Sequence, residues 1–245
     1  PASLSHKSEL EKILDTRYIG WSRPHALTNP LPVKIIAFYL PQFHEIEENN
    51  RWWGEGFTEW VNVKKASPLF PGHSQPIQPG ELGYYALDNV ETLRRQSKLA
   101  SAYGINGFCF YFYWFGGKTL LESPLELLLE AKDIAIEFCL CWANENWTRK
   151  WDGLEKEVLI AQSHSPEDDL DFIKHVSKYF ADSRYLKIDG KPVLTIYRPS
   201  LLPNPQETVD RWRKWCRDNG VGEIVVSATH ALDRIDPIEH GFDAA

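Results

Sequence analysis

One short segment of this chain combines a carboxylate with amides and indoles: Cys141-Trp142-Ala143-Asn144-Glu145-Asn146-Trp147. Glu145 follows an apolar run and stands between two amides, with an indole on either side of them. An indole beside a carboxyl group excludes water and raises the carboxyl pKa, which suits a general acid. The amides can orient the carboxyl group or bind a sugar hydroxyl. We therefore predict that Glu145 is catalytic; the alternative is a structural carboxylate that pairs with Arg149 or Lys150.

Glycoside chemistry commonly uses a second carboxylate, about 5–5.5 Å from the first when configuration is retained and about 6.5–9.5 Å when it is inverted. Three residues are candidates: Asp152 lies shortly after Glu145, Glu59 lies in an aromatic stretch, and Asp243 lies near the end of the chain. Turn capping and pairing with arginine are the structural alternatives. We predict Glu145, Asp152 and Glu59 as the catalytic residues and Asp243 as a substrate ligand.

The chain is rich in aromatic residues, with 10 Trp, 10 Tyr and 12 Phe. Aromatic side chains usually fill a core, but several tryptophans here stand among Gly, Asn, Arg and Glu, as residues of loops do. Flat rings in polar loops suit the apolar faces of sugars. We expect one cleft with Glu145 to be lined by Trp52, Trp60, Trp114, Trp147 and Trp151. The predicted substrate ligands are Gln42, His44, Trp52, Trp60, Trp114, Asn144, Asn146, Trp147, Arg149, Trp151, Tyr197, Arg198 and Asp243.

Other kinds of active site lack their sequence signatures. The chain has no H-E-x-x-H motif and no close cluster of His and Asp, so we predict no metal site and no cofactor. A Ser-His-Asp triad lacks its G-x-S-x-G elbow. No glycine-rich phosphate-binding motif follows a predicted strand, which argues against a nucleotide-binding fold.

The elements that must position this chemistry alternate between short apolar runs and helical segments. This alternation predicts a parallel α/β fold, and nearly all-apolar strands are expected where both faces of a sheet are covered. Polar and aromatic residues follow the C-terminal ends of the strands, where the active site of a barrel lies. Strands are predicted at 33–40, 107–114, 138–143, 192–197 and 224–228, with a sixth beginning at 242–245, and helices at 90–103, 124–135, 167–180 and 206–219.

We predict a parallel (β/α)8 TIM-type barrel that is truncated at its C-terminal end in this chain, because five or six strands are present where a closed barrel needs eight. Residues 1–32 are then a helical N-terminal extension, and residues 33–245 are the incomplete catalytic barrel. The connection 41–89 is long, and long loops of compact domains are usually functional or disordered; its aromatic residues argue against disorder. Pro1 and the absence of Met favour a segment of a longer chain with further domains.

Charge and cysteine usage restrict the partners and the compartment. The net charge is −7 without a run rich in Lys or Arg, so we expect no nucleic-acid partner. No apolar run reaches the roughly 20 residues that span a bilayer. Cys109, Cys139 and Cys141 lie in apolar runs, as buried and reduced thiols do. Reduced thiols favour a cytoplasmic location; a periplasmic or extracellular one is the alternative for a degradative hydrolase.

Several longer motifs resemble those of the WbsX family, also described as glycoside hydrolase family 99-like. The resemblance runs from about residue 33 to the end of the chain. It is carried by FYLPQFH at 38–44, WWGEGFTEW at 52–60, PLFPGH at 68–73, LGYY at 82–85, YWF at 113–115, CLCWANENWTR at 139–149, WDG at 151–153, RY at 184–185, DGKP at 189–192, YRP at 197–199 and GFDA at 241–244.

The resemblance implies a (β/α)8 barrel and a role in surface-polysaccharide metabolism, often O-antigen or lipopolysaccharide assembly. Members of the family are commonly labelled glycosyltransferases, and the hydrolase relatives are retaining endo-α-mannosidases. Those relatives pair their acidic residue with a second Glu three positions on, where this chain has Thr148, so their mechanism does not carry over. Three functions remain open. They are a glycoside hydrolase or transglycosidase acting on a bacterial surface polysaccharide, a glycosyltransferase, and a glycan-binding module without turnover.

Overall fold

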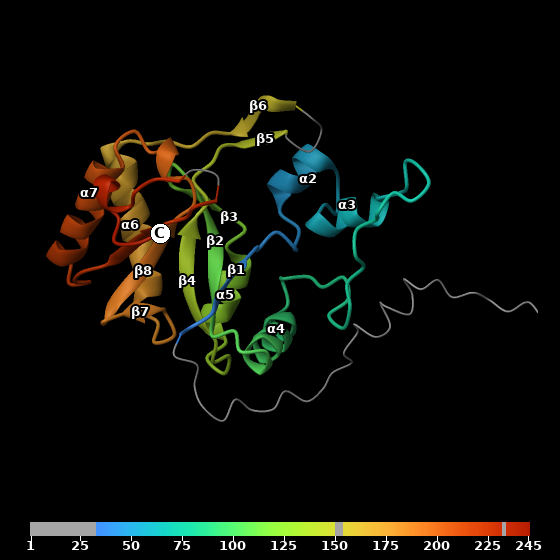
Figure 1. Ribbon diagram of the computed structural model, residues 1–245, viewed down its shortest axis with the longest axis horizontal. Coiled ribbons are helices and arrows are strands. Elements are labelled where there is room, and N and C mark those ends of the chain that lie inside the picture. Colours follow the sequence, from blue (N-terminus) through green and yellow to red (C-terminus); the bar gives the residue numbers. More distant parts are fainter. Residues whose placement is uncertain (1–32, 150–153, 232–233) are drawn as a thin grey trace, which may run out of the picture.

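The computed structural model describes residues 33–149, 154–231 and 234–245 (Figure 1). The predicted N-terminal extension, 1–32, and the predicted site residues Trp151 and Asp152 lie outside the described residues. The centre of the molecule is a parallel sheet, and its strands begin within three residues of the five predicted starts. In spatial order the strands are β1 (Ile36–Tyr39), β2 (Gly107–Phe115), β4 (Glu137–Trp142), β8 (Lys191–Ile196) and β9 (Val225–Ala228).

The predicted sixth strand is present as a single bridge beside β9. Ala244 forms a parallel bridge with Ser227, and the amide of Asp243 donates to the carbonyl of Val226 at 2.8 Å. The parallel α/β architecture is therefore confirmed. The described residues form an open sheet, and closure into a barrel stays a prediction.

Three shorter pairings were not predicted. The strand β3 (Lys118–Leu120) runs antiparallel to β2, and β7 (Lys187–Ile188) runs antiparallel to β8. A separate hairpin consists of β5 (Trp147–Arg149) and β6 (Leu154–Ile160). This hairpin follows β4 directly, so it leaves the sheet at the segment that carries Glu145.

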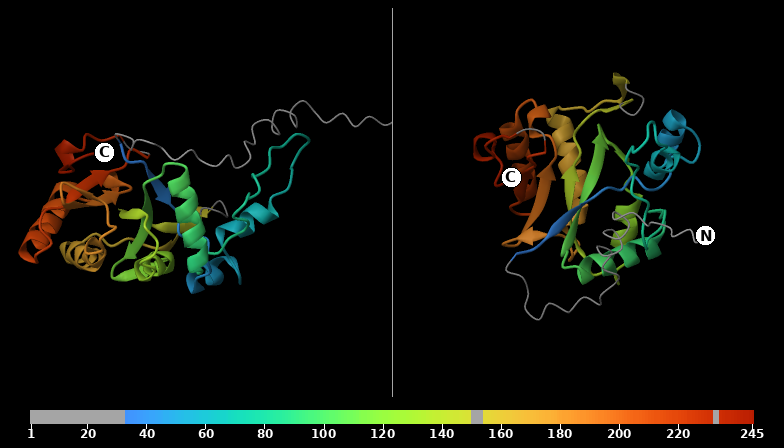
Figure 2. Two further views of the ribbon diagram at one scale, coloured as in Figure 1. Left: turned by 90° about the horizontal axis from the view of Figure 1, so that it is seen from below. Right: turned by 45° about the vertical axis from the view of Figure 1, so that its right-hand side comes forward.

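Four helices pack against the sheet: α4 (Val90–Ala102), α5 (Ser123–Glu130), α6 (Pro166–Phe180) and α7 (Pro205–Asp218). Figure 2 shows α5, α6 and α7 side by side along one face of the sheet. Three helices begin at residues whose side chains accept a backbone N–H, as good N-caps do. These capping residues are Asn89, Ser165 and Asn204.

The helix α5 ends five residues before its predicted end at residue 135. The reason is Arg184, whose guanidinium donates to the carbonyl oxygens of Leu128, Ala131 and Ile134. The carbonyl of Leu128 lies in the last helical turn, where no intrahelical donor reaches it. The long-range contacts of Arg184 thus satisfy carbonyl oxygens at the point where another helical turn was predicted.

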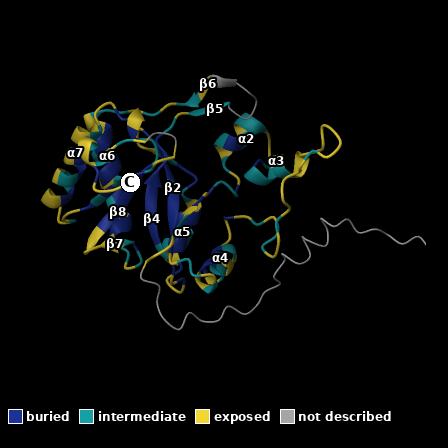
Figure 3. Ribbon diagram, viewed as in Figure 1, coloured by how far each residue is buried: buried dark blue, intermediate teal, exposed yellow. Residues whose placement is uncertain are grey.

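The core lies between the sheet and the helices, and the buried residues gather on the strands (Figure 3). Its densest part is aromatic: the ring of Trp142 stacks on Phe172 at 4.5 Å between centroids and packs against Trp212 at 5.9 Å. Burying a large apolar side chain contributes roughly 1.5–3 kcal/mol to stability. The face of β4 that carries Trp142 therefore packs in the core. The opposite face of the strand and its C-terminal end remain for function.

The connection between β1 and α4 contains two short helices that the sequence did not predict, α2 (Glu47–Trp53) and α3 (Glu59–Lys65). In Figure 1 both lie beyond the C-terminal end of β1. Two single-turn 3-10 helices, at Pro199–Leu201 and Ile238–His240, follow β8 and β9. The long connection is thus folded back over the end of the sheet where the active site was expected.

Candidate active site

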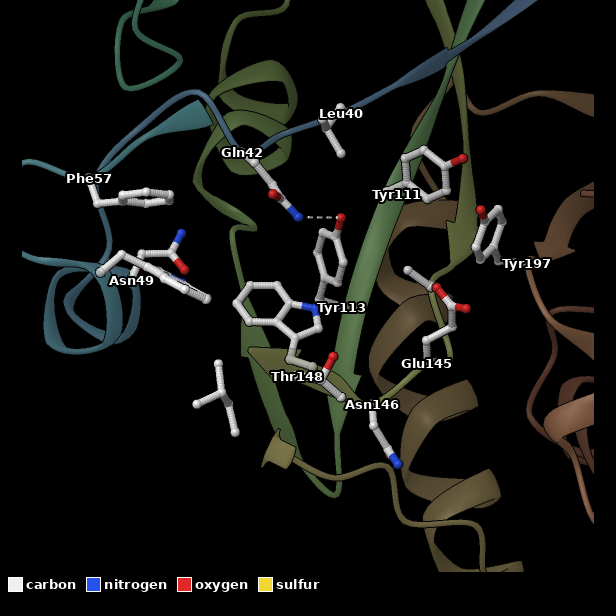
Figure 4. A pocket seen from close by; sticks show the side chains of 14 residues that line it. Leu40, Gln42, Asn49, Phe57, Tyr111, Tyr113, Glu145, Asn146, Thr148 and Tyr197 are labelled. Carbon is white, nitrogen blue, oxygen red and sulfur yellow. Dashed lines mark hydrogen bonds between the residues drawn. The ribbon is translucent and has the colours of Figure 1, made fainter. Parts of the chain in front are cut away.

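A cavity of about 340 Å³ lies at the C-terminal ends of the central strands (Figure 4). Its floor consists of residues that end or follow four strands: Leu40 and Gln42 after β1, Tyr111 and Tyr113 on β2, Glu145 after β4, and Tyr197 after β8. The remaining lining residues come from the long connection, the turn after β4 and the hairpin; they are Asn49, Trp53, Phe57, Ala143, Asn146, Trp147, Thr148 and Leu159. The structure therefore places Glu145 and the end of the sheet in one cavity.

Glu145 is held by an arginine of the neighbouring strand end. Arg198 donates from Nη1 to Oε1 of Glu145 at 2.7 Å, and the Glu145 side chain is 41% exposed. Arg149, the partner considered from the sequence, pairs instead with Glu157 at 2.8 Å. Trp142 lies in the core, so of the two flanking indoles only Trp147 shares the cavity with Glu145.

Asn144 is fully buried and joins the ends of β4 and β8. Its Nδ2 donates to the carbonyl oxygen of Arg198 at 2.8 Å, and the amide of Arg198 donates to its Oδ1 at 2.8 Å. A half-exposed ion pair alone contributes only about 0–1 kcal/mol. The two amide contacts therefore supply the stronger connection between the strand ends.

Asn146 also makes a contact within the protein, although it lines the cavity. Its Oδ1 accepts the backbone N–H of Gln162 at 2.7 Å. Both amides that flank Glu145 are thus bound to neighbouring segments, and only Asn146 is also open to a ligand.

Glu59 does not line the cavity, but it lies next to two residues that do, Gln42 and Tyr113. Its backbone N–H donates to the carbonyl oxygen of Gln42 at 3.4 Å, and the Gln42 side chain donates to the hydroxyl of Tyr113 at 2.8 Å. Burial raises the pKa of Glu59 to about 7. Burial also raises the pKa of Tyr113 above its ordinary value, and the nearby charge of Glu59 adds to that effect.

The two carboxyl groups flank the same pair of tyrosines. Burial raises the pKa of Tyr111 to about 12, and the charge of Glu145 is among the smaller causes. Tyr111 and Tyr113 are two residues apart on β2, so their side chains share one face and their backbones lie about 6.6 Å apart. Glu145 is near the first tyrosine and Glu59 near the second.

Of the five tryptophans predicted for one cleft, the four that the structure describes lie in several environments. Trp147 lines the cavity, and Trp52 packs edge-on against it at 5.7 Å between centroids. Trp60 packs on Phe43 and lines a separate apolar groove of about 730 Å³. Trp114 is buried in the core, where its Nε1 donates to Asp168 at 2.9 Å.

Of the remaining predicted ligands, some line the cavity and others lie outside it. Gln42 and Tyr197 line the cavity. His44 is buried outside it, and burial lowers its pKa. Arg149 lies 5.9 Å from the ring of Trp53, near the cavity. Asp243 pairs with Arg213 at 2.9 Å and accepts the backbone N–H of Val226, so it fastens the sixth segment to β9.

Several lining residues were missed from the sequence, and most had a weak signal there. Tyr111 and Tyr113 lie in an apolar run, where alternation places their hydroxyls on one face. Trp53 and Phe57 stand in the same aromatic stretch as Glu59 but belong to a connection whose helices were not predicted. Their side chains could not be assigned to a face without that backbone.

The described residues show no metal centre, membrane span or disulfide beside this cavity. No group of three or more His, Cys, Asp or Glu in this part of the chain is arranged to hold a metal ion. Within the same residues, no helix combines the length and apolar character needed to cross a membrane. All four cysteines are free and buried.

Comparison with known proteins gives a family match and curated relatives. The model of the family described as Glycosyltransferase WbsX matches residues 35–245. The WxcX proteins of two strains of Xanthomonas campestris pv. campestris, each described as uncharacterized, are 53% identical over 223 residues. The match covers 91% of this chain and 32% of each relative, so the chain spans about a third of their length.

Two solved structures show a weaker likeness. A GH99 endo-α-mannosidase from Bacteroides thetaiotaomicron is 17% identical with a TM-score of 0.46, and the match covers 79% of this chain and 54% of that one. A structure described as a glycoside hydrolase-like protein is 17% identical with a TM-score of 0.49, and covers 82% of this chain and 55% of that one.

Proposed function

The chain belongs to the WbsX glycosyltransferase family, and we propose that its cavity is the active site of an enzyme that cleaves or transfers a glycosidic bond with Glu145 and Glu59 as the two carboxyl groups. The family supports a glycan-active enzyme. We assign different catalytic roles to Glu145 and Glu59 from the surroundings of each residue.

One observation carries the proposal: two carboxyl groups beside one cavity have opposite environments. Glu145 is paired with Arg198 at 2.7 Å, whereas burial raises the pKa of Glu59 to about 7. An acid and a base are commonly distinguished in this way, because their environments separate two groups of the same chemical type. Glu59 is therefore the general acid, and Glu145 acts as a carboxylate.

The reaction follows from these roles. Glu59 donates its proton to the leaving glycosidic oxygen as the bond from the anomeric carbon breaks. Glu145 either attacks the anomeric carbon or removes a proton from the attacking hydroxyl, which belongs to water in hydrolysis and to a sugar in transfer. Catalytic hydrogen bonds often shorten only when substrate binds, so Glu59 can serve from the edge of the cavity. Asp152, outside the described residues, is the alternative second carboxylate.

The other lining residues suit a sugar. Trp53 and Trp147 supply flat rings, and the hydroxyls of Tyr111 and Tyr197 are protonated near neutral pH, as tyrosines ordinarily are, and burial raises the pKa of each further. Such groups donate to and accept from sugar hydroxyls. The predicted polysaccharide or oligosaccharide substrate is consistent with this lining.

The second candidate is a glycosyltransferase with an activated sugar donor, which the family description favours. The chain contains one D-x-D triplet, Asp169-Leu170-Asp171, the kind of sequence that holds a metal in many such enzymes. Here Asp169 accepts from Arg211 at 2.6 Å and from Thr208 at 2.9 Å between α6 and α7. This triplet therefore has a structural role, and a transferase would use the cavity instead.

The test compares Glu145→Gln with Glu137→Gln. Glu137 begins the strand that Glu145 follows, and it pairs with Lys34 at 2.7 Å at the opposite end of the sheet. Both variants would be assayed on aryl glycosides and bacterial surface polysaccharides, with and without nucleotide-sugar donors. We expect Glu145→Gln to lose about 10²–10⁴-fold in turnover while Glu137→Gln stays near wild type. Full turnover in a folded Glu145→Gln variant would end the assignment. Altered binding with no turnover in the wild type would indicate a glycan-binding module.

A further inference from the structure

The turn that carries Glu145, residues 143–146, is held on two opposite sides. On the side of β8, Asn144 exchanges two hydrogen bonds with the backbone of Arg198. On the other side, Gln162 follows the return strand of the hairpin. Its Nε2 donates to the carbonyl oxygens of Glu145 at 3.2 Å and Ala143 at 3.5 Å, while its backbone N–H donates to Oδ1 of Asn146.

These contacts hold the backbone of the turn and leave its carboxylate free for the cavity. The side-chain amide of Gln162 contacts the main chain of Glu145 and Ala143, and the side-chain amide of Asn144 contacts the main chain of Arg198. The side chains of Glu145 and Arg198 then meet from two anchored backbones. A half-exposed ion pair is too weak to fix its own geometry, so its 2.7 Å contact depends on these anchors.

We propose that Asn144 and Gln162 are positioning residues that set the Glu145 carboxylate against Arg198 for catalysis. The inference rests on the proposed function of the cavity. Asn144 fixes the spacing between the ends of β4 and β8, and Gln162 prevents the turn from moving towards the hairpin. Asn144, first expected to bind sugar, thus acts through Arg198 and Glu145 instead.

The first test separates positioning from stability. Asn144→Ala and Gln162→Leu would be compared with Thr208→Val, which removes a buried hydrogen bond to Asp169 in a region remote from the cavity. On an aryl glycoside that the wild type hydrolyses, we expect kcat to fall about 10²-fold for Asn144→Ala and somewhat less for Gln162→Leu, with KM nearly unchanged. Thr208→Val should lower the melting temperature and leave kcat unchanged. Equal kcat in all three variants would overturn the proposal.

A double-mutant cycle checks the route of the effect. Arg198→Lys keeps the backbone that Asn144 binds but changes the group that meets Glu145. If Asn144 acts through this pair, Asn144→Ala should reduce kcat much less in the Arg198→Lys background than in the wild type. Independent effects would multiply, and that result would contradict the proposed route.

Hydrogen–deuterium exchange on the intact protein needs no substrate. It therefore tests the clamp, meaning the contacts by which Asn144 and Gln162 hold residues 143–146, separately from the function. Asn144→Ala should speed exchange of the amides at 143–148 well beyond the change in Thr208→Val. Unchanged exchange there would sink the clamp even if Glu145 proves catalytic. Faster exchange together with full activity in Glu145→Gln would instead sink the proposed function and leave the clamp as a structural feature.

Discussion

The two walls of the cavity provide opposite environments for a carboxyl group. The strand wall, made by Tyr111, Glu145 and Tyr197, places its carboxylate against an arginine in a half-exposed position. The connection wall, made by Asn49, Trp53 and Phe57 of segment 41–89, adjoins a carboxyl group whose pKa burial raises to about 7. Figure 4 shows Asn49 and Phe57 on one side, and Tyr111, Tyr197 and Glu145 on the other.

The difference between the walls has a structural cause. The strand wall belongs to regular elements whose ends are joined by hydrogen bonds, so a polar pair can be held there in contact with water. The connection wall is built from short helices and aromatic side chains, which exclude water from whatever they cover. The same residue type therefore meets two environments, an arginine partner for Glu145 and partial burial that raises the pKa of Glu59.

The largest effect should come from breaking the strand wall. Arg198→Met removes the partner of Glu145 but keeps the backbone contacts to Asn144. We expect kcat on an aryl glycoside to fall about 10²-fold, because a catalytic group displaced by about 1 Å loses that much. Arg198→Lys should recover part of the loss. Wild-type kcat in Arg198→Met would show that the carboxylate needs no partner.

Glu59, which adjoins the connection wall, should make the free energy of unfolding depend on pH. The folded-state pKa of Glu59 lies above its unfolded value, so the folded protein binds this proton more tightly than the unfolded chain. That stabilising contribution is fully present below about pH 4.5 and is lost as pH rises through about 7. Glu59→Gln removes the titrating group. We expect the variant to gain up to about 2 kcal/mol over the wild type between pH 5 and pH 8, since partial exposure weakens the full effect.

Urea unfolding at the two pH values measures this gain. Glu137→Gln serves as the matched control, because Glu137 pairs with Lys34 at the surface. A constant difference between Glu59→Gln and the wild type at both pH values would mean that partial burial does not raise the pKa of Glu59.

The smallest expected effect separates cavity aromatics from core aromatics. Trp53→Leu should weaken oligosaccharide binding about 5–10-fold, because the ring lines the cavity, and should change stability little. Trp114→Phe should leave affinity unchanged but lower stability by about 1–3 kcal/mol, because it leaves the buried Asp168 without its indole donor. Calorimetric titration and thermal melts measure the two effects. The reverse pattern would restore Trp114 to the site.

The sequence was a good guide to the strand wall and a poor one to the connection wall. Short apolar runs located β2, β4 and β8, and parallel strands must end at one edge, so Glu145 and Tyr197 could be placed together. The pairing of Glu145 with Arg198 was not predicted, because a side-chain contact across two strand ends depends on their spacing. Trp114 was misplaced because a tryptophan near a strand end can face either the cavity or the helices.

Within the connection wall the sequence indicated the residue types but not their positions. Seven-residue helices such as α2 and α3 give too few turns for a clear periodicity. Trp53 therefore could not be distinguished from Trp52, although only the former lines the cavity.

The division of work between Glu145 and Glu59 is tested most directly by changing the leaving group. A 2,4-dinitrophenyl glycoside needs no proton on departure, whereas a natural glycan or an alkyl glycoside of the same sugar does. For Glu59→Gln we expect hydrolysis of the poor leaving group to fall about 10²–10⁴-fold, and hydrolysis of the activated one to fall less than about tenfold. Glu145→Gln should reduce both rates alike. Equal losses on the two substrates in Glu59→Gln, or no loss on either, would contradict the assignment of Glu59 as the acid.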